Sequence, residues 1–599
     1  MTGEPTRRVF ICSCEDTMPL DGAGIARACA RALPGSTVTE ARQLCRAELD
    51  RFTDALGAGD VLVACTQEAP LFAERAEDAG HRGRLDTVNI REQAGWSSEA
   101  RGATAKIAAL IAAAAVPMPE TAVVPYTSEG VTLIYGRDEA AIEAAQALEH
   151  RLNLTVLLTK PKAVTPPRAT AFPVLKGTIR SAKGHLGAFE LTVDDYAAPA
   201  PSSRAALDFG PGRDGAKSRC DVILDLSGGV PLFPAHHKRP GYLRADPGDP
   251  VAVQKAIMKA AELVGQFDKP RFVSFTESLC AHSRNKRTGC TRCLDLCPVG
   301  AISPNGDHVA VDTNICAGCG SCTAVCPTGA ASYALPPADA LMRKLRALLL
   351  TYAEAGGARP VVLVHEGEHG APLIEALARH GQGLPARVLP FAVNEITALG
   401  LETIAAAFAH GAAELQVLMA TRPRDDTEAL DRTLTLADTV LRGLGFGEGR
   451  LGVIAADTPD QLAAALAALP RREGVAEPRR FLAMGDKRGV TQTALRELAK
   501  AAPVPATIVP LPEKAPFGNL RIDAEGCTLC LSCVSACPTG ALRDNPDRPM
   551  LTFTEDACVQ CGLCAATCPE KVITLEPRLN LGPAAAEPRL VKEEEPFHC

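Results

Sequence analysis

Sixteen of the 23 cysteines fall in four short runs, and these runs are the strongest chemical signal in the 599-residue sequence. Three runs share the spacing C-x2-C-x2-C-x3-C-P, and the remaining run has nine residues after its first cysteine. The runs are Cys280, Cys290, Cys293 and Cys297; Cys316, Cys319, Cys322 and Cys326; Cys527, Cys530, Cys533 and Cys537; and Cys558, Cys561, Cys564 and Cys568. This spacing is typical of [4Fe–4S] binding, in which three cysteines hold one cluster and the fourth reaches a second cluster.

The spacing also predicts which cysteines meet around each cluster. The paired runs are separated by 18 residues in one case and 20 in the other, so each pair is predicted to form one small two-cluster unit. The predicted ligand sets are Cys280, Cys290, Cys293 and Cys326; Cys316, Cys319, Cys322 and Cys297; Cys527, Cys530, Cys533 and Cys568; and Cys558, Cys561, Cys564 and Cys537. Structural zinc is the alternative, but zinc uses separated Cys-x2-Cys pairs and needs no third cysteine at that spacing. These units resemble bacterial ferredoxin domains.

Four cysteines near the N-terminus form a further candidate metal site. Cys12 and Cys65 end two predicted parallel strands, so we expect them at the carboxyl edge of a sheet, where α/β folds place their ligands. With Cys14 and Cys45 they would supply four ligands for a fifth cluster. The alternative is a set of buried thiols without a metal, and the sequence leaves both interpretations open.

No motif in the sequence indicates bond-making catalysis, and we expect no catalytic residues. Residues 365–369 (His-Glu-Gly-Glu-His) match the zinc-protease pattern H-E-x-x-H, which requires both histidines on one face of a helix. Here the motif follows an apolar strand, contains Gly367 and precedes Pro372, so we expect a strand-to-helix loop. The sequence contains neither a G-x-S-x-G elbow nor a phosphate-binding P-loop.

The composition excludes several function classes. The chain is 46% apolar and 22% charged, which is an ordinary globular balance. A net charge of −7, one Trp and six Tyr argue against a nucleic-acid partner. The longest apolar stretch, Ile107 to Val116, is too short to cross a bilayer. Residues 6–10 resemble a twin-arginine export motif, but acidic residues follow at 15 and 16, so we expect a cytoplasmic protein with reduced thiols.

Alternating strand and helix patterns predict α/β domains with parallel sheets, combined with two α+β ferredoxin-type domains. The expected strands are Val9–Cys12, Asp60–Cys65, Val131–Tyr135, Leu154–Leu158, Val361–Val364, Arg387–Leu389, Leu415–Met419 and Leu451–Ala455. The predicted domains are an N-terminal α/β domain (1–116), a degenerate nucleotide-binding-like α/β domain (120–275), a first two-cluster domain (276–335), an α/β domain without cysteine (338–470), a connecting segment (471–519), a second two-cluster domain (520–577) and an acidic tail (578–599). We expect the tail to be disordered.

Parts of the chain resemble known redox proteins. Residues 9–14, Cys45, 61–66 and 88–96 are similar to the N-terminal domain of the heterodisulfide reductase A subunit, which bears flavin and clusters, although Ala94 stands where that family has a cysteine. The resemblance implies that an FAD-binding βαβ unit follows. In residues 133–141 only Gly136 remains of its glycines, and Asp138 and Glu139 would oppose the diphosphate, so we expect no FAD. Residues 358–470 resemble the delta subunit of methyl-viologen-reducing hydrogenase without its cluster cysteines.

The whole arrangement resembles iron–sulfur proteins that accompany molybdenum formate dehydrogenases, with weaker support from residues 177–185. This resemblance implies an electron-transfer subunit with four or five [4Fe–4S] clusters, which exchanges electrons with redox partner proteins such as a formate dehydrogenase. Two alternatives stay open. One is a catalytic heterodisulfide-reductase-like subunit, and the other is an accessory factor for dehydrogenase maturation.

Overall fold

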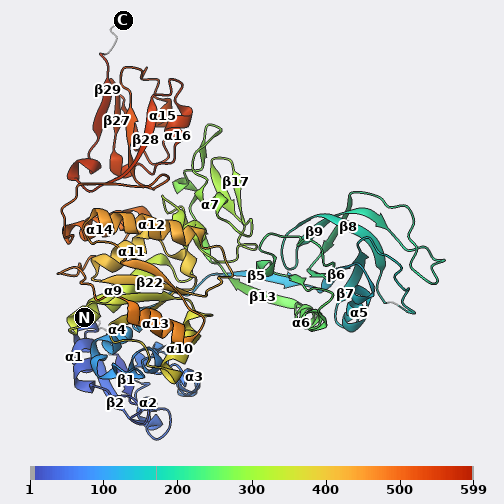
Figure 1. The fold of residues 1–599 in the computed structure, drawn as a ribbon, viewed down its shortest axis with the longest axis horizontal. Helices are drawn as coiled ribbons and strands as arrows, with labels where there is room; N and C mark the ends of the chain where they lie inside the picture. Colours follow the sequence, from blue (N-terminus) through green and yellow to red (C-terminus); the bar gives the residue numbers. More distant parts are fainter. Residues whose placement is uncertain (1–6, 58, 170, 596–599) are drawn as a thin grey trace.

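The computed structural model describes residues 7–57, 59–169 and 171–595. Three α/β domains and two cysteine-rich domains are arranged as an elongated body with one lateral domain (Figure 1). The N-terminal domain lies at one end of the body and the second cysteine-rich domain at the other. We call residues 123–270 the side domain, residues 273–333 the first cysteine-rich domain, and residues 508–593 the second cysteine-rich domain.

The N-terminal domain contains a four-stranded parallel sheet in the order β2-β1-β3-β4. Its strands are β1 (Arg8–Cys12), β2 (Thr37–Ala41), β3 (Val61–Val63) and β4 (Leu85–Thr87), and its helices are α1 (Gly22–Ala32), α2 (Leu49–Thr53), α3 (Ala69–Asp78) and α4 (Thr104–Ala114). Val9, Val61 and Leu62 are fully buried because helices cover both faces of the sheet. The predicted parallel α/β architecture is confirmed here.

Helix α4 is buried on nearly all sides, because it packs between the N-terminal domain and α9 (Ala338–Glu354) of the body. Its Lys106 is fully buried, and its Nζ donates a hydrogen bond to the Pro385 carbonyl oxygen at 3.2 Å. Burial lowers the pKa of Lys106 to about 7. The protonated form is therefore costly in the folded protein.

We expect Lys106→Met to raise the free energy of unfolding at pH 7 by about 1–3 kcal/mol, because it removes a buried group that charges readily once unfolded. Between pH 7 and the ordinary lysine pKa the unfolded chain binds more protons, so the native protein loses stability as the pH falls through this range. The variant should lose this dependence of stability on pH. Thermal unfolding at pH 7 and pH 9 measures both effects, and an unchanged slope would contradict this interpretation.

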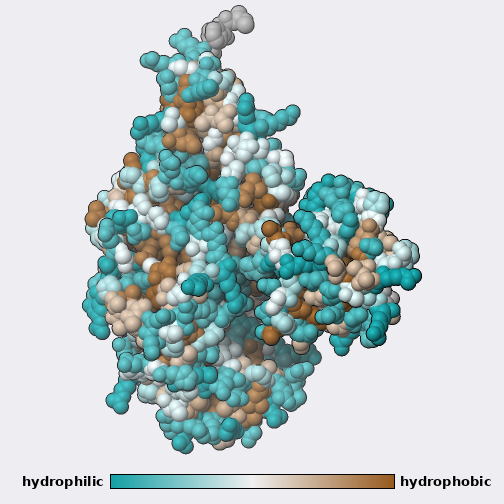
Figure 2. Space-filling view, turned by 45° about the vertical axis from the view of Figure 1, so that its right-hand side comes forward, coloured by the Kyte–Doolittle hydropathy of each residue, from teal (hydrophilic) through white to brown (hydrophobic). Residues whose placement is uncertain are grey.

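The side domain contains a seven-stranded sheet in the order β10-β9-β8-β7-β6-β11-β12. Parallel pairs join β6 (Val131–Gly136), β7 (Asn153–Leu158), β8 (Val174–Lys183), β11 (Val222–Asp225) and β12 (Tyr242–Arg244). Strand β9 (Phe189–Ala197) runs in the opposite direction and pairs antiparallel with both β8 and β10 (Ala216–Cys220). Helices α5 (Glu139–Leu148) and α6 (Pro250–Ala261) pack against it. An antiparallel ribbon of β5 (Val123–Ser128) and β13 (Gly265–Pro270) connects this domain to the body (Figure 1). Figure 2 shows the surface recessed between the side domain and the body.

The third α/β domain has a parallel sheet in the order β21-β20-β22-β23. Its strands are β20 (Val361–His365), β21 (Val388–Ala392), β22 (Glu414–Met419) and β23 (Leu451–Ala455). Helices α10 (Gly370–His380) and α13 (Pro459–Ala468) cover one face, and α9, α11 (Leu401–Ala409) and α12 (Glu428–Gly443) cover the other. His365 ends β20 and His369 precedes α10, so the H-E-x-x-H match is the predicted strand-to-helix loop.

Short strands and helices make up the first cysteine-rich domain. They are β14 (Val273–Phe275), β15 (Ser283–Arg284), β16 (Arg287–Thr288), α7 (Arg292–Asp295), β17 (Ile302–Asn305), β18 (His308–Val311), α8 (Ser321–Val325) and β19 (Ala331–Tyr333). Strand β14 pairs with β19 across the domain, and β17 pairs with β18. Between these pairs, the cysteines lie on loops and on the first turns of short helices.

The second cysteine-rich domain repeats this plan and extends it. Its elements are β24 (Ile508–Pro510), β25 (Gly518–Ile522), α15 (Ser532–Ala536), β26 (Leu542–Asn545), β27 (Arg548–Phe553), α16 (Leu563–Thr567), β28 (Ile573–Asn580) and β29 (Arg589–Glu593). The prediction of a disordered tail is wrong for the described residues, because β29 pairs with β27. Val591 also packs against the apolar core of this domain.

Within the described residues, no helix is both long and apolar enough to cross a membrane.

Candidate iron–sulfur centres

Three of the four cysteine loops share one backbone conformation. A residue in the left-handed region stands on each side of the second cysteine of each run. These flanking pairs are Gly318 and Gly320, Leu529 and Leu531, and Gln560 and Gly562. A Cβ on Gly318 would lie 2.6 Å from the Phe272 ring, so glycine is required there by space as well as by conformation. Each of these loops thus turns on both sides of its second cysteine.

The structure brings together the members of both ligand sets predicted for the first cysteine-rich domain. The pKa of Cys293 is raised to about 12, chiefly by burial and then by the neighbouring thiols of Cys290, Cys326 and Cys280. Burial likewise raises the pKa of Cys322, with contributions from Cys319, Cys316, Cys293 and Cys297. Each fourth cysteine therefore lies beside the run that is more distant in sequence.

In the second cysteine-rich domain, the fourth cysteine of each run likewise lies beside the other run. Burial raises the pKa of Cys533 to about 11, and Cys527, Cys530 and Cys568 add to the effect. For Cys564, burial again raises the pKa most, followed by the thiols of Cys558, Cys561 and Cys537. The structure therefore groups all sixteen cysteines of the four runs as the spacing predicts.

Hydrogen bonds to sulfur fit thiolate ligation. The Ala301 amide donates to Cys297 Sγ at 3.2 Å, and the Ala331 amide donates to Cys326 Sγ at 3.4 Å. Such donors stabilise negative charge on the sulfurs and help to set cluster potentials. In the part of the chain that the structure describes, no three His, Cys, Asp or Glu side chains are arranged to hold a single metal ion.

The two cysteine-rich domains meet at Cys290 and Cys561. Burial raises the pKa of Cys561 to about 11, and its own set contributes along with Cys290 of the other domain. Packing at this junction is tight, because a Cβ on Gly289 would lie 2.5 Å from Leu563 Cγ. Both cysteines also line one groove of about 830 Å³. One set of each domain therefore faces the other across a short boundary.

Helix α14 (Lys487–Lys500) holds the two cysteine-rich domains together through consecutive residues. Lys487 Nζ donates to the carbonyl oxygens of Thr323 and Ala324 in the first domain. Arg488 donates to the carbonyl oxygens of Pro516, Asp556 and Cys558 in the second domain, each within 2.9 Å.

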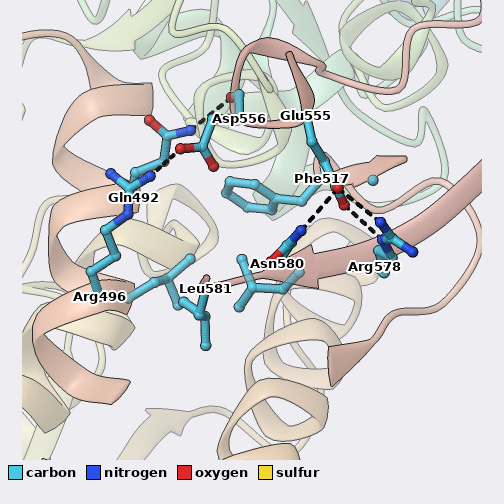
Figure 3. Close-up of a pocket in the computed structure, with 11 residues that line it drawn as sticks. Gln492, Arg496, Phe517, Glu555, Asp556, Arg578, Asn580 and Leu581 are labelled. Carbon is cyan, nitrogen blue, oxygen red and sulfur yellow. Dashed lines mark hydrogen bonds and ion pairs between the residues drawn. The ribbon is translucent and has the colours of Figure 1, made fainter. Parts of the chain in front are cut away.

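Further contacts of α14 reinforce its hold on the second domain. The Arg488 guanidinium lies 4.4 Å from the centre of the Phe517 ring. One helical turn further along, Gln492 and then Arg496 reach Asp556 (Figure 3). Residues 471–519, predicted to be a connecting segment, contain this helix. The buried spacing of Val490, Ala494 and Leu498 was the signal for this helix.

The two outer sets differ in exposure. Cys530, in the second domain, is exposed, and hydrogen bonding with Ser532 lowers its pKa. At the other extreme, Cys316 in the first domain lines a cavity of about 860 Å³ against the third α/β domain. One of these sets thus has a cysteine exposed to solvent, and a cysteine of the other lines the cavity beside the third α/β domain.

The four N-terminal cysteines line a single cavity of about 210 Å³. Cys12 ends β1 and Cys65 follows β3, the neighbouring strand, at the carboxyl edge of the sheet. Burial raises the pKa of Cys45, with smaller contributions from Glu68, Cys65 and Cys12. Ala94 does not line this cavity and packs in the hydrophobic core instead. The structure thus brings the predicted set together.

Arg91 gives this cavity a positive charge. Its Nη1 donates to Cys14 Sγ at 3.6 Å, and its guanidinium lies 4.3 Å from the centre of the Trp96 ring. The Arg91 charge also lowers the pKa of Cys65, although burial has the larger effect and raises it. Arg91 therefore offsets only part of the cost of a buried thiolate, the form that metals bind, and the metal itself would have to supply the rest.

The loop between β6 and α5 joins a parallel strand to a helix, at the place predicted for a degenerate nucleotide-binding unit. A Cβ on Gly136 would lie 2.4 Å from the Ala141 Cβ, so glycine allows the close strand-to-helix packing. The Asp138 carboxylate caps α5 by accepting from the Ala140 amide at 3.2 Å. A carboxylate therefore occupies the N-terminus of α5.

Comparison with protein families identifies both cysteine-rich domains. Residues 286–330 and residues 526–573 each match a model of a 4Fe-4S dicluster domain. The chain is an iron–sulfur protein. Its two dicluster domains account for four [4Fe–4S] clusters, and their chemistry is electron transfer. The first match begins after Cys280, so this predicted ligand lies outside it. No curated protein matches the chain.

Proposed function

We propose that this iron–sulfur protein relays electrons through four [4Fe–4S] clusters in series between two partner sites. Each cluster takes one of the four crossed sets of cysteines. When bound, the clusters supply one-electron oxidation and reduction. The residues of the chain then hold the clusters at fixed separations, exclude water and donate hydrogen bonds to the cluster ligands.

The junction between the two dicluster domains is the observation that carries this proposal. If the two dicluster domains carried electrons independently, their function would not require Cys290 beside Cys561 or Gly289 packed against Leu563. Within the first domain, Cys293 and Cys322 are also neighbours. If each set is named by its first cysteine, the sets therefore follow one another along the molecule in the order Cys316, Cys280, Cys558 and Cys527. This order supports one continuous path.

The exposed end at Cys530 suits a protein partner, because electrons enter and leave most readily at an exposed cluster. The resemblance of the whole chain makes a molybdenum formate dehydrogenase the first partner to test, in the cytoplasm. The chain then acts as an electron-transfer subunit, and bond-making chemistry takes place in the partner.

Anaerobic affinity purification with metal analysis tests this function. We expect about sixteen irons per chain in the dicluster domains and a copurifying molybdenum protein that reduces the clusters when formate is added. Clusters that no copurified dehydrogenase reduces would contradict the relay. Unaided turnover of disulfides by the chain would support the catalytic alternative instead.

We further propose that Cys12, Cys14, Cys45 and Cys65 hold a fifth [4Fe–4S] cluster. Replacing Cys65 with serine in the full chain is then expected to remove about four of about twenty irons without changing the dicluster spectra. Cys29→Ser is the matched control, because Cys29 is fully buried in helix α1 outside the cavity. Four freely titrating thiols in folded, iron-replete protein would contradict a fifth cluster.

The β6–α5 loop predicts that the purified protein contains no FAD. Asp138 caps the helix where the diphosphate would bind, and its charge would repel that group. Chromatography of the supernatant after denaturation measures bound FAD directly. A stoichiometric amount of FAD would overturn this prediction and reopen an electron-splitting mechanism.

A further inference from the structure

A cavity of about 860 Å³ opens where the side domain meets the third α/β domain, in the region of the recess visible in Figure 2. Its inner wall follows the carboxyl ends of β20, β21 and β22, and includes Glu366, Glu395 and Ala420. Strand β20 lies between β21 and β22 in the sheet. The connection that follows β20 therefore runs to one side, and the connection that follows β21 returns to the other side. Open α/β sheets bind their ligands at this topological switch point.

The cavity presents positive and negative groups on different segments. The side domain contributes Lys238 and Lys269, and the loop after β22 contributes Arg422. Lys238 pairs with Asp425, and Arg424 pairs with Glu368. Among the described residues, Arg422, Glu366 and Glu395 have no ion-pair partner within 4.0 Å. A ligand that meets both kinds of group needs an anionic part and hydrogen-bond donors.

Glu395 is suited to such a ligand. Burial raises its pKa to about 7, Lys238 lowers it, and Glu366, Asp425 and Glu368 raise it again. Burial also raises the pKa of Glu366. Near neutral pH the Glu395 carboxyl group can therefore both accept and donate hydrogen bonds, as recognition of ring nitrogens and carbonyls requires.

The cavity also borders a cluster loop. Cys316, Ala317 and Phe272 form part of its wall. Tyr333 donates to the Gly318 carbonyl oxygen at 2.7 Å and accepts from Asn394, which lies on the cavity side of the third domain. Thr397 donates to the Cys319 carbonyl oxygen. These bonds fix the cavity against the outer cluster of the first dicluster domain.

We propose that this cavity binds a mononucleotide of the flavin class, a planar nitrogen heteroaromatic with one phosphate. Arg422 and Lys269 would bind the phosphate, and Glu366 and Glu395 would bind the polar edge of the ring. The volume lies in the range of small-molecule sites, and sheets with this strand order bind FMN at the same switch point. The choice of a redox-active ligand rests on the proposed relay, whereas the site itself does not.

Titration of the full chain with FMN, followed by quenching of flavin fluorescence, tests the proposal. We expect one FMN to bind per chain. Gly367→Trp should weaken binding at least about tenfold, because Gly367 lines the cavity and a Cβ there meets open space that the indole would fill. Gly210→Trp is the matched control, since Gly210 also has open space around it but lies outside the cavity.

Two further arms test the assigned roles. Arg422→Ala is expected to weaken FMN binding about tenfold and to leave riboflavin, which lacks the phosphate, unaffected. Absence of FMN binding, or binding that Gly367→Trp does not change, would overturn the proposal. The readout is FMN binding and does not depend on electron transfer. If the relay fails and FMN still binds, the FMN site remains supported. If the relay works and FMN does not bind, only the FMN site is wrong.

Discussion

Cys326→Ser is expected to remove the cluster of Cys280, Cys290 and Cys293 while the cluster of its own run persists. The reason is the crossing, since Cys326 lies beside Cys293 in space. Iron content should fall by about four of the roughly sixteen irons in the dicluster domains. EPR or Mössbauer spectroscopy of anaerobically purified protein distinguishes the lost cluster from the retained one.

Cys220→Ser is the matched control for this variant. Cys220 is a buried thiol in the side domain that belongs to none of the cysteine sets, so its replacement should leave the iron content unchanged. Loss of the cluster held by Cys316, Cys319 and Cys322 in the Cys326 variant would show that the runs are not crossed. The ligand assignment in both dicluster domains would then be wrong.

Arg488→Met is expected to loosen the second dicluster domain. The change leaves the carbonyl oxygens of Pro516, Asp556 and Cys558 without their cationic donor in a buried position. We expect the variant to lose about 2–4 kcal/mol of stability, measured from the loss of cluster absorbance on heating. The potential of the cluster beside Cys558 should also fall, because a nearby positive charge is removed.

Lys500→Met controls for the loss of a cation from the same helix. Lys500 lies at the exposed end of α14, so its replacement should change stability by no more than about 0.5 kcal/mol. An Arg488 variant as stable as the Lys500 variant would contradict the role of α14 in holding the domains. Unchanged cluster potentials would separately contradict the electrostatic effect.

Patterns that depend on local spacing predicted most of the site. The cysteine runs predicted two cluster domains, which the family comparison confirms. The predicted strand Val361–Val364 is the core of β20, because a continuous apolar run is what a parallel strand buried on both faces requires. The same reasoning placed Cys12 and Cys65 at one sheet edge, and the structure has them lining one cavity.

Features that depend on contacts distant in sequence could not be predicted. Lys487 and Arg488 look like ordinary solvated charges, and only the fold shows that each binds carbonyl groups of a different domain. The acidic tail contains Leu590 and Val591 between charges, and β29 forms because β27 offers it an edge for pairing. The junction of Cys290 and Cys561 likewise joins segments about 270 residues apart, beyond any local pattern.

EPR spectroscopy of the fully reduced chain tests directly whether the four clusters form one series. Its spectrum is compared with the sum of spectra from two variants. One variant carries Cys290→Ser and Cys319→Ser, and the other carries Cys530→Ser and Cys561→Ser. The proposed series predicts a broader spectrum than this sum, because the clusters of Cys290 and Cys561 interact magnetically across the domain boundary. A spectrum equal to the sum would show two independent carriers and contradict a continuous path.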